Sequence, residues 1–145
     1  MPFYNLANAQ MIEVAVSGPG DVTRLYICKG LANGNTGVSV NPGGSQTITE
    51  TWQFEVGPTI PATQFRRAIA TVGFAGISEA DPSPGGRAGW AVQNVFADYD
   101  DDAGQVRVSV TNVLSVANTS NANYEYAGVA TLGYDVSILA AVAAG

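Results

Sequence analysis

Apolar and polar residues alternate with a period of two over much of this chain. The clearest run covers residues 46–56. Within it Trp52, Phe54 and Val56 share one side, and threonine and glutamine side chains occupy the other. Such alternation is typical of a β-strand with one buried face. Glu50 falls on the apolar side of this run, so we expect it near the exposed end of the strand or at a bend.

Seven other segments carry the same signal, and turn or loop residues separate them. Gly-Pro-Gly-Asp at 18–21 and Asn-Pro-Gly-Gly at 41–44 are strong turn signals, and 32–35 reads as a polar loop. Gly73 and Gly76 interrupt one run and predict a bend or bulge there. The further predicted strands are 11–17, 22–28, 37–40, 65–77, 90–99, 105–113 and 124–139.

Aromatic residues in alternating strands are more often core anchors than platforms for a ligand. We therefore expect Trp52 and Trp90 to be buried. The alternation in 90–99 also places Phe96 on the side of Trp90. In 11–17 it places Ile12, Val14 and Val16 together on one face.

These signals predict an all-β chain, namely an antiparallel β-sandwich of about eight strands. A jelly roll is one arrangement that such strands adopt. The chain has 145 residues and no shift of composition along its length, so we expect one domain, 1–145. Hydrophobic residues make up 46% of the chain and charged residues only 12%, which is the opposite of a disordered composition.

Acidic residues outnumber basic ones by twelve to six, which gives a net charge of −6. Only Arg66 and Arg67 are adjacent basic residues, whereas nucleic acid or an anionic membrane requires a basic patch. We therefore expect neither as a partner. No signal peptide and no run of about 18 apolar residues stands out, so we expect no membrane span. We expect cytoplasmic synthesis, with a virion or release from the cell as further destinations.

The chain contains no histidine and a single cysteine, Cys28. Without histidine, Ser-His-Asp and Cys-His catalysis and imidazole-dependent zinc sites are excluded. Cys28 lies in an apolar run, where we expect it to act as a small buried side chain. Several carboxylate residues lie near one another in the sequence. No spacing between them, however, indicates a catalytic acid and a catalytic base held together. The sequence therefore predicts a protein that is not an enzyme.

Asp98, Asp100 and Asp102 are spaced like the opening of a calcium-binding loop, with Gly104 beyond them. Hard oxygen ligands at alternate positions suit calcium. The glycine comes one residue late, however, and the twelfth position is Ser109 rather than glutamate. The alternative is a solvated acidic hairpin tip, so calcium is a weak candidate and no other cofactor is predicted.

Two segments form the predicted recognition surface. The first is the acidic tip, where Tyr99 and Asn94 accompany the aspartates. The second is the long connection 78–89, which is rich in proline and glycine. Loops on a rigid sandwich commonly carry recognition. The candidate ligand-binding residues are Asn94, Asp98, Tyr99, Asp100, Asp102, Glu79, Asp81 and Arg87.

Three functions remain open. The first is a non-catalytic structural subunit of a homo-oligomeric assembly, such as a virion-type decoration or fibre protein, and it fits the sparse charge and the apolar termini. The second is a carbohydrate-binding sandwich lectin, with or without calcium. The third, an enzyme that uses carboxylates, has the least support. The rhythm of strands and turns from Gln64 to Leu139 resembles small sandwich lectins and phage fibre or capsid-decoration domains, a likeness that concerns fold alone.

Overall fold

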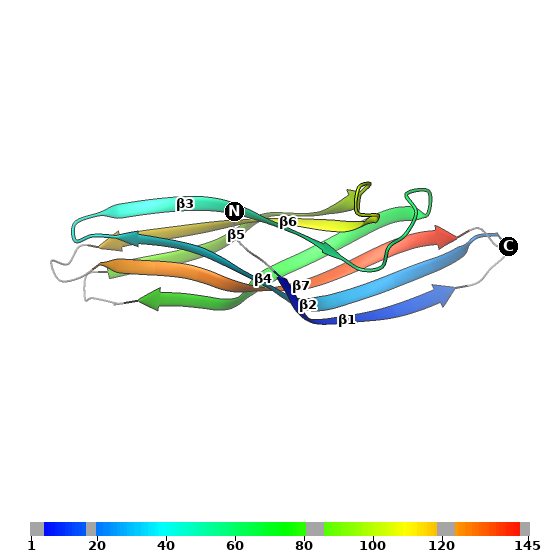
Figure 1. Cartoon of the computed structure of the whole chain (residues 1–145), viewed down its shortest axis with the longest axis horizontal. Helices are drawn as coiled ribbons and strands as arrows, with labels where there is room; N and C mark the ends of the chain where they lie inside the picture. The colour runs from blue at the N-terminus through cyan, green and yellow to red at the C-terminus, as the bar shows by residue number, and fades with distance from the viewer. Residues whose placement is uncertain (1–4, 17–19, 81–85, 119–123, 143–145) are drawn as a thin grey trace.

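The computed structural model describes residues 5–16, 20–80, 86–118 and 124–142. Nearly all of these residues lie in long strands, and none of them is helical. The strands follow the long axis of an extended molecule (Figure 1). They are β1 (Asn5–Val16), β2 (Val22–Val40), β3 (Ser45–Val56), β4 (Phe65–Ala80), β5 (Gly86–Asp100), β6 (Gln105–Asn118) and β7 (Glu125–Val142).

Two antiparallel sheets form a sandwich, as the alternation predicted. Sheet A has the order β1-β2-β7-β4, and sheet B has the order β3-β6-β5. The pairing is nested, because β2 pairs with β7 and β3 pairs with β6, while β5 and β6 form the innermost hairpin. This wrapping resembles a jelly roll with three strands to a sheet. β1 is added to sheet A outside the nested strands.

The described strands number seven rather than about eight, because 22–28 and 37–40 belong to one strand. β2 continues through 32–35, which the polar residues had suggested to be a loop. A register shift between Asn33 and Thr36 accommodates this segment against β7. In β4, register shifts on both sides of Gly76 confirm the predicted bulge.

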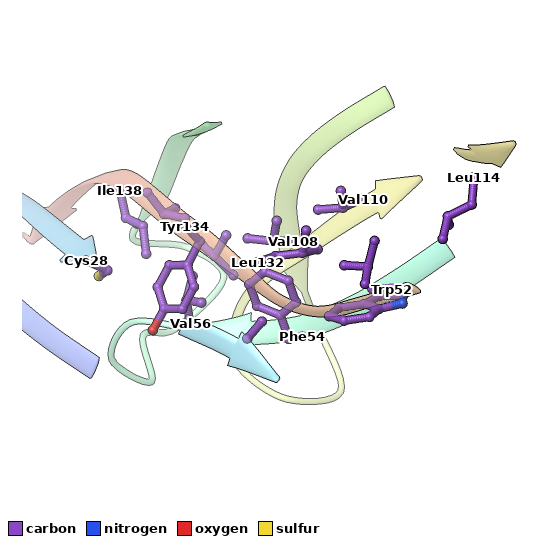
Figure 2. Packing of buried hydrophobic residues seen from close by; sticks show 14 of the residues in the cluster. Cys28, Trp52, Phe54, Val56, Val108, Val110, Leu114, Leu132, Tyr134 and Ile138 are labelled. Atoms are coloured by element: carbon purple, nitrogen blue, oxygen red, sulfur yellow. The ribbon is translucent and has the colours of Figure 1, made fainter. Parts of the chain in front are cut away.

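The core lies between the sheets, along the inward faces of β6 and β7. Both strands are flanked by neighbours on both sides, so their inward side chains are covered from every direction. Burying a large apolar side chain contributes about 1.5–3 kcal/mol, so these two strands supply much of the stability. Figure 2 shows several of these side chains between the sheets. Fully buried members of the core include Trp52, Phe54, Val108, Val110, Leu114, Leu132, Val136 and Ile138.

Each tryptophan links one sheet to the other. The Trp52 indole N–H in β3 donates to the Thr36 hydroxyl in β2 at 2.8 Å. The Trp90 indole N–H in β5 donates to the Gly128 carbonyl in β7 at 3.1 Å. A buried indole N–H needs such a partner. The prediction that both tryptophans anchor the core is confirmed, because Trp52 is fully buried and Trp90 packs against the core.

Glu50 lies in the middle of β3, so the prediction of an exposed end or a bend is wrong. Its carboxylate accepts a hydrogen bond from the Thr36 hydroxyl at 2.8 Å, and that hydroxyl itself accepts from Trp52. This chain of hydrogen bonds allows a charged group to face inward. Asn112 stands opposite Glu50 in β6 and is fully buried, and no described residue hydrogen-bonds its side-chain amide.

Replacing Asn112 by leucine, which has a similar volume, is expected to raise the free energy of unfolding by about 1–2 kcal/mol. The reason is that a buried polar group without a partner costs about 1–3 kcal/mol. Urea unfolding monitored by tryptophan fluorescence measures the change. Thr49→Val on the exposed side of β3 is the control and should alter stability by less than about 0.5 kcal/mol. A loss of stability in Asn112→Leu would contradict this description of the core.

Candidate functional site

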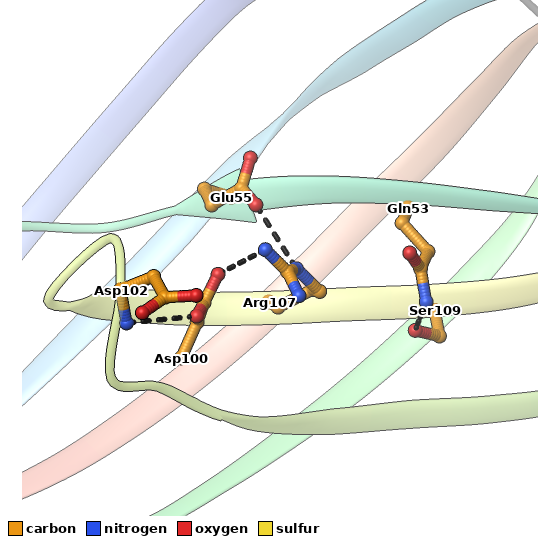
Figure 3. A network of polar contacts seen from close by, with 6 residues as sticks. All are labelled: Gln53, Glu55, Asp100, Asp102, Arg107 and Ser109. Carbon is orange, nitrogen blue, oxygen red and sulfur yellow. Dashed lines mark hydrogen bonds and ion pairs between the residues drawn. The ribbon is translucent and has the colours of Figure 1, made fainter.

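The acidic turn, residues 98–102, is organised by an arginine from the neighbouring strand. Arg107 in β6 donates from Nε to the Glu55 carboxylate at 3.0 Å, and its Nη2 pairs with the Asp100 carboxylate (Figure 3). Asp100 is buried and also accepts the backbone N–H of Asp102 at 3.1 Å. Asp100 therefore neutralises Arg107 and closes its own turn.

Tyr99 also has a structural role in this turn. Its hydroxyl donates to the Ile60 carbonyl at 2.6 Å, and its ring stacks on Phe65 with centroids 5.4 Å apart. These contacts fix the acidic turn against the start of β4. Asp98 stays exposed, and its carboxylate accepts the N–H of Tyr99 at 2.8 Å. Of the residues predicted to bind a ligand at this turn, Asp98 and Asp102 face solvent.

The geometry of the turn does not favour the predicted calcium site. Across the part of the chain that the structure describes, no three carboxylate or thiol side chains are grouped so as to hold a metal ion. The carboxylate of Asp100 is directed at Arg107, which competes with a cation for the same oxygen atoms. Calcium takes six to eight oxygen ligands. Calcium binding by Asp98, Asp100 and Asp102 therefore stays a prediction that these contacts do not support.

The other predicted site residues lie away from the acidic turn. Asn94 sits further back along β5. Glu79 is close to the end of β4 and Arg87 to the beginning of β5, which places both at the opposite end of the sandwich. Asp81 lies outside the described residues. The predicted recognition residues therefore do not form one continuous patch.

Phe96 is placed differently from the prediction. Asn94 has a positive φ of 48°, and the pairing of β5 with β6 shifts between Gln93 and Phe96. This bulge reverses the alternation, so Phe96 is 63% exposed instead of packing beside Trp90. Asparagine tolerates positive φ better than most residues, and it was the one signal of the bulge in the sequence. Phe96 lines an open hollow of about 430 Å³ with Asp98, Tyr99, Asp100, Asp101, Asp102, Arg107 and Ser109.

The outer face of sheet B is polar and rich in hydroxyl groups. Cross-strand hydrogen bonds join the side chains of β3 to those of β6. They connect Thr47 with Ser115 at 2.9 Å and Gln53 with Ser109 at 3.1 Å. Such pairs satisfy one another while remaining open to water.

Part of the outer face of sheet A is apolar, and it borders Arg67 in β4 and the ion pair of Lys29 with Asp135. Register places Val14, Leu25 and Leu139 in one row across β1, β2 and β7. Ile12, Ile27 and Ile69 lie in the adjacent row, interrupted by Ser137. The prediction that Ile12, Val14 and Val16 share a face is confirmed, but that face is the outside of the sandwich. We call this surface the apolar face: Ile12, Val14, Val16, Leu25, Ile27, Ile69 and Leu139.

Two carboxyl groups meet at the other end of the sandwich. Glu125 is fully buried against Gly86, and no described lysine or arginine pairs with it. Contact with Glu125 raises the pKa of the neighbouring Glu79, because a hydrogen bond between the two side chains favours its protonated form, and burial and charge repulsion add to the effect. This pair was not foreseen, since the two residues are far apart in the sequence.

Cys28 is buried, as expected, with 3% of its surface exposed. Burial raises the pKa of its thiol above the ordinary value, and the nearby charge of Asp135 acts in the same direction. A higher pKa lowers the fraction of thiolate, which is the reactive form. Cys28 is therefore an inert member of the core.

No family model, curated protein or solved structure matches this chain. Within the described ranges, no helix has the length and apolar character needed to cross a bilayer. The described features that bear on function are the apolar face, the hollow beside Phe96 and the carboxyl pair of Glu79 and Glu125.

The carboxyl pair makes stability depend on pH. Because the pKa of Glu79 is raised in the folded state, the fold binds a proton more tightly than the unfolded chain does. The resulting stability is complete below the unfolded pKa of about 4.3 and is lost as pH rises through the folded pKa. Glu125→Gln should therefore flatten the decline of unfolding free energy that begins as pH rises above about 4.

Urea unfolding at a series of pH values measures this effect. Asp101→Asn removes one negative charge from the exposed acidic turn and serves as the control, which should keep the slope of the native chain. If Glu125→Gln and the native chain lose stability in parallel as pH rises, the carboxyl pair is not the source of the dependence.

Proposed function

We propose that this chain is a non-catalytic structural subunit that assembles with copies of itself, of the kind that decorates or extends a viral particle. The observation that carries the proposal is the apolar face of sheet A. Its members include Ile69, which is 61% exposed, and Leu139, which is 37% exposed. Large contiguous apolar surfaces on a folded chain mark sites of interaction.

The contrast between the two outer faces supports this role. Sheet A presents a cluster of valine, leucine and isoleucine. Sheet B presents mainly hydroxyl and amide groups that pair across strands, with Phe96 exposed in its border strand β5. A subunit with one apolar and one polar face suits a layer in which the first meets its neighbours and the second meets water. The low charge content of 12% reduces repulsion between copies.

The arrangement of reactive groups favours a non-catalytic role. The close carboxyl pair of Glu79 and Glu125 includes one residue that is fully buried. At the acidic turn, Asp100 is held by Arg107. These contacts give the carboxyl groups of Glu125 and Asp100 positions within the fold, which suits a structural role.

Light scattering of the full chain at micromolar concentration is expected to report a mass above that of the monomer. The double variant Ile69→Lys/Leu139→Lys should form smaller species, because a lysine in the apolar face must lose its hydration when that face is covered. Circular dichroism checks that the variant is still folded.

The matched control is Thr49→Lys/Thr51→Lys, which adds the same two charges to the polar outer face of sheet B. It should keep the mass of the native chain. A native chain that is strictly monomeric, or a control that dissociates as fully as the variant of the apolar face, would contradict the proposed function.

A second candidate function is carbohydrate binding at the hollow beside Phe96. The exposed ring offers an apolar platform, and Asp98, Arg107 and Ser109 line the same hollow. Sites for small polar ligands combine such a surface with a few polar groups that fix orientation. The bulge at Asn94 is what exposes the ring.

Glycan binding on an array, with and without calcium, tests this second function. Phe96→Ala should abolish binding by the native chain, whereas Ile77→Ala, which removes another exposed apolar side chain from β4, should leave it unchanged. Absence of any glycan ligand in both conditions would exclude the hollow as a lectin site.

A further inference from the structure

β1 lies outside the double layer of the sandwich. It pairs with β2 alone, and it forms one border of sheet A (Figure 1). Sheet B has only three strands, which face β2, β7 and β4. An open hollow of about 300 Å³ separates the inward side of β1 from the end of sheet B, and Met11, Cys28, Val56 and Tyr134 are among the residues that line it.

The outward side chains of β1 are apolar but uncovered, and Met11 adds an apolar side chain on the inward face, which it shares with Glu13 and Ala15. Eleven of its twelve residues are exposed. On the outer face, Ile12 is 62% and Val16 is 63% exposed. On the inward face, Met11 is 49% exposed. An ordinary strand with one buried face alternates between apolar and polar residues. In β1 the outer, exposed face carries the apolar residues that a covered face normally carries.

The free border of β1 is regular over residues 10–16. Its one irregularity, the register shift between Ala7 and Gln10 with Asn8 at a positive φ of 52°, lies near the beginning of the strand. Proteins protect such edges with bulges, prolines, lysines or exposed charges. β4, at the other border of sheet A, has three register shifts and two arginines at its start. β5 has the bulge at Asn94. In β1, residues 10–16 pair regularly with β2 and contain one charge, Glu13, which Arg24 neutralises at 3.1 Å.

We propose that β1 pairs edge to edge with β1 of a second copy, in antiparallel orientation, to join the two A sheets into one sheet of eight strands. This inference rests on the proposed function and adds a second contact to the one that the apolar face makes. The groups left without partners along the edge are backbone N–H and C=O groups at strand spacing. Another extended strand satisfies them best, and each copy of the chain carries one of matching composition.

Charge disfavours one register of this pairing and favours another. Centring the two-fold axis on Glu13 would place the two Glu13 carboxylates opposite each other, which is unfavourable. Centring it on Val14 pairs Val14 with its own copy and Ile12 with Val16 of the second copy. Glu13 then lies opposite Ala15 of the second copy. Ala15 pairs with Arg24 across β1 and β2. The Glu13 carboxylate of one copy therefore lies in the same cross-strand row as Arg24 of the other copy.

Cysteine cross-linking tests both the edge and its register. Val14→Cys should form a covalent dimer under mild oxidation that dithiothreitol reverses, because the two side chains face each other across the axis. An equimolar mixture of Ile12→Cys and Val16→Cys should give a mixed dimer, more readily than either variant alone. The native Cys28 is buried and does not compete.

Ile69→Cys is the control, since Ile69 is as exposed as Val16 but lies on β4. It should not cross-link at the rate of Val14→Cys. If the native chain is oligomeric by light scattering but Val14→Cys and the mixture remain unlinked, the edge pairing is wrong while the proposed function stands. If the native chain is monomeric at every concentration, both fail.

Discussion

The packing of β6 against β7 is the interaction on which the rest of this structure depends. Both strands lie inside their sheets, and valine, leucine and isoleucine fill the space between them. Trp52 and Trp90 then hold the sheets together through hydrogen bonds that cross from one sheet to the other. Three strands on each side complete this packing. The unequal number of strands is therefore a physical constraint, because sheet B cannot also cover the fourth strand of sheet A.

That constraint connects the fold to the proposed function. β1 extends sheet A beyond its cover, and its outward apolar side chains join those of β2, β7 and β4 in the apolar face. Sheet B has no described strand that extends beyond sheet A. On its outer surface, hydroxyl and amide side chains of β3 and β6 hydrogen-bond one another across the strands. We propose that a further copy of the chain covers the first of these two unlike faces, and that the free border of β1 sets the direction in which a second copy adds.

The fold could be predicted from the sequence more fully than the candidate site. The alternation of apolar and polar residues around Trp52 and Phe54 identified a buried strand face. It could do so because successive side chains of a strand point to opposite faces, whatever the strand pairs with. Polar residues such as Asn33 suggested a loop, but pairing with neighbours on both sides keeps β2 extended through them. Phe96 was misplaced because one bulge at Asn94 reverses every later side chain. The roles of Asp100 and Glu125 depend on partners distant in the chain, Arg107 and Glu79, which no local pattern reveals.

Hydrogen–deuterium exchange of the backbone amides at 10–16, followed over a range of protein concentrations, most directly tests whether β1 is the border at which copies meet. Edge pairing predicts that these amides become more protected as the concentration rises, because those that point away from β2 gain hydrogen-bond partners only in the assembly. The amides of β4, at the opposite border of sheet A, serve as the internal comparison and should change less. Exchange at 10–16 that stays fast and independent of concentration, in a chain that is otherwise oligomeric, would contradict the proposed arrangement.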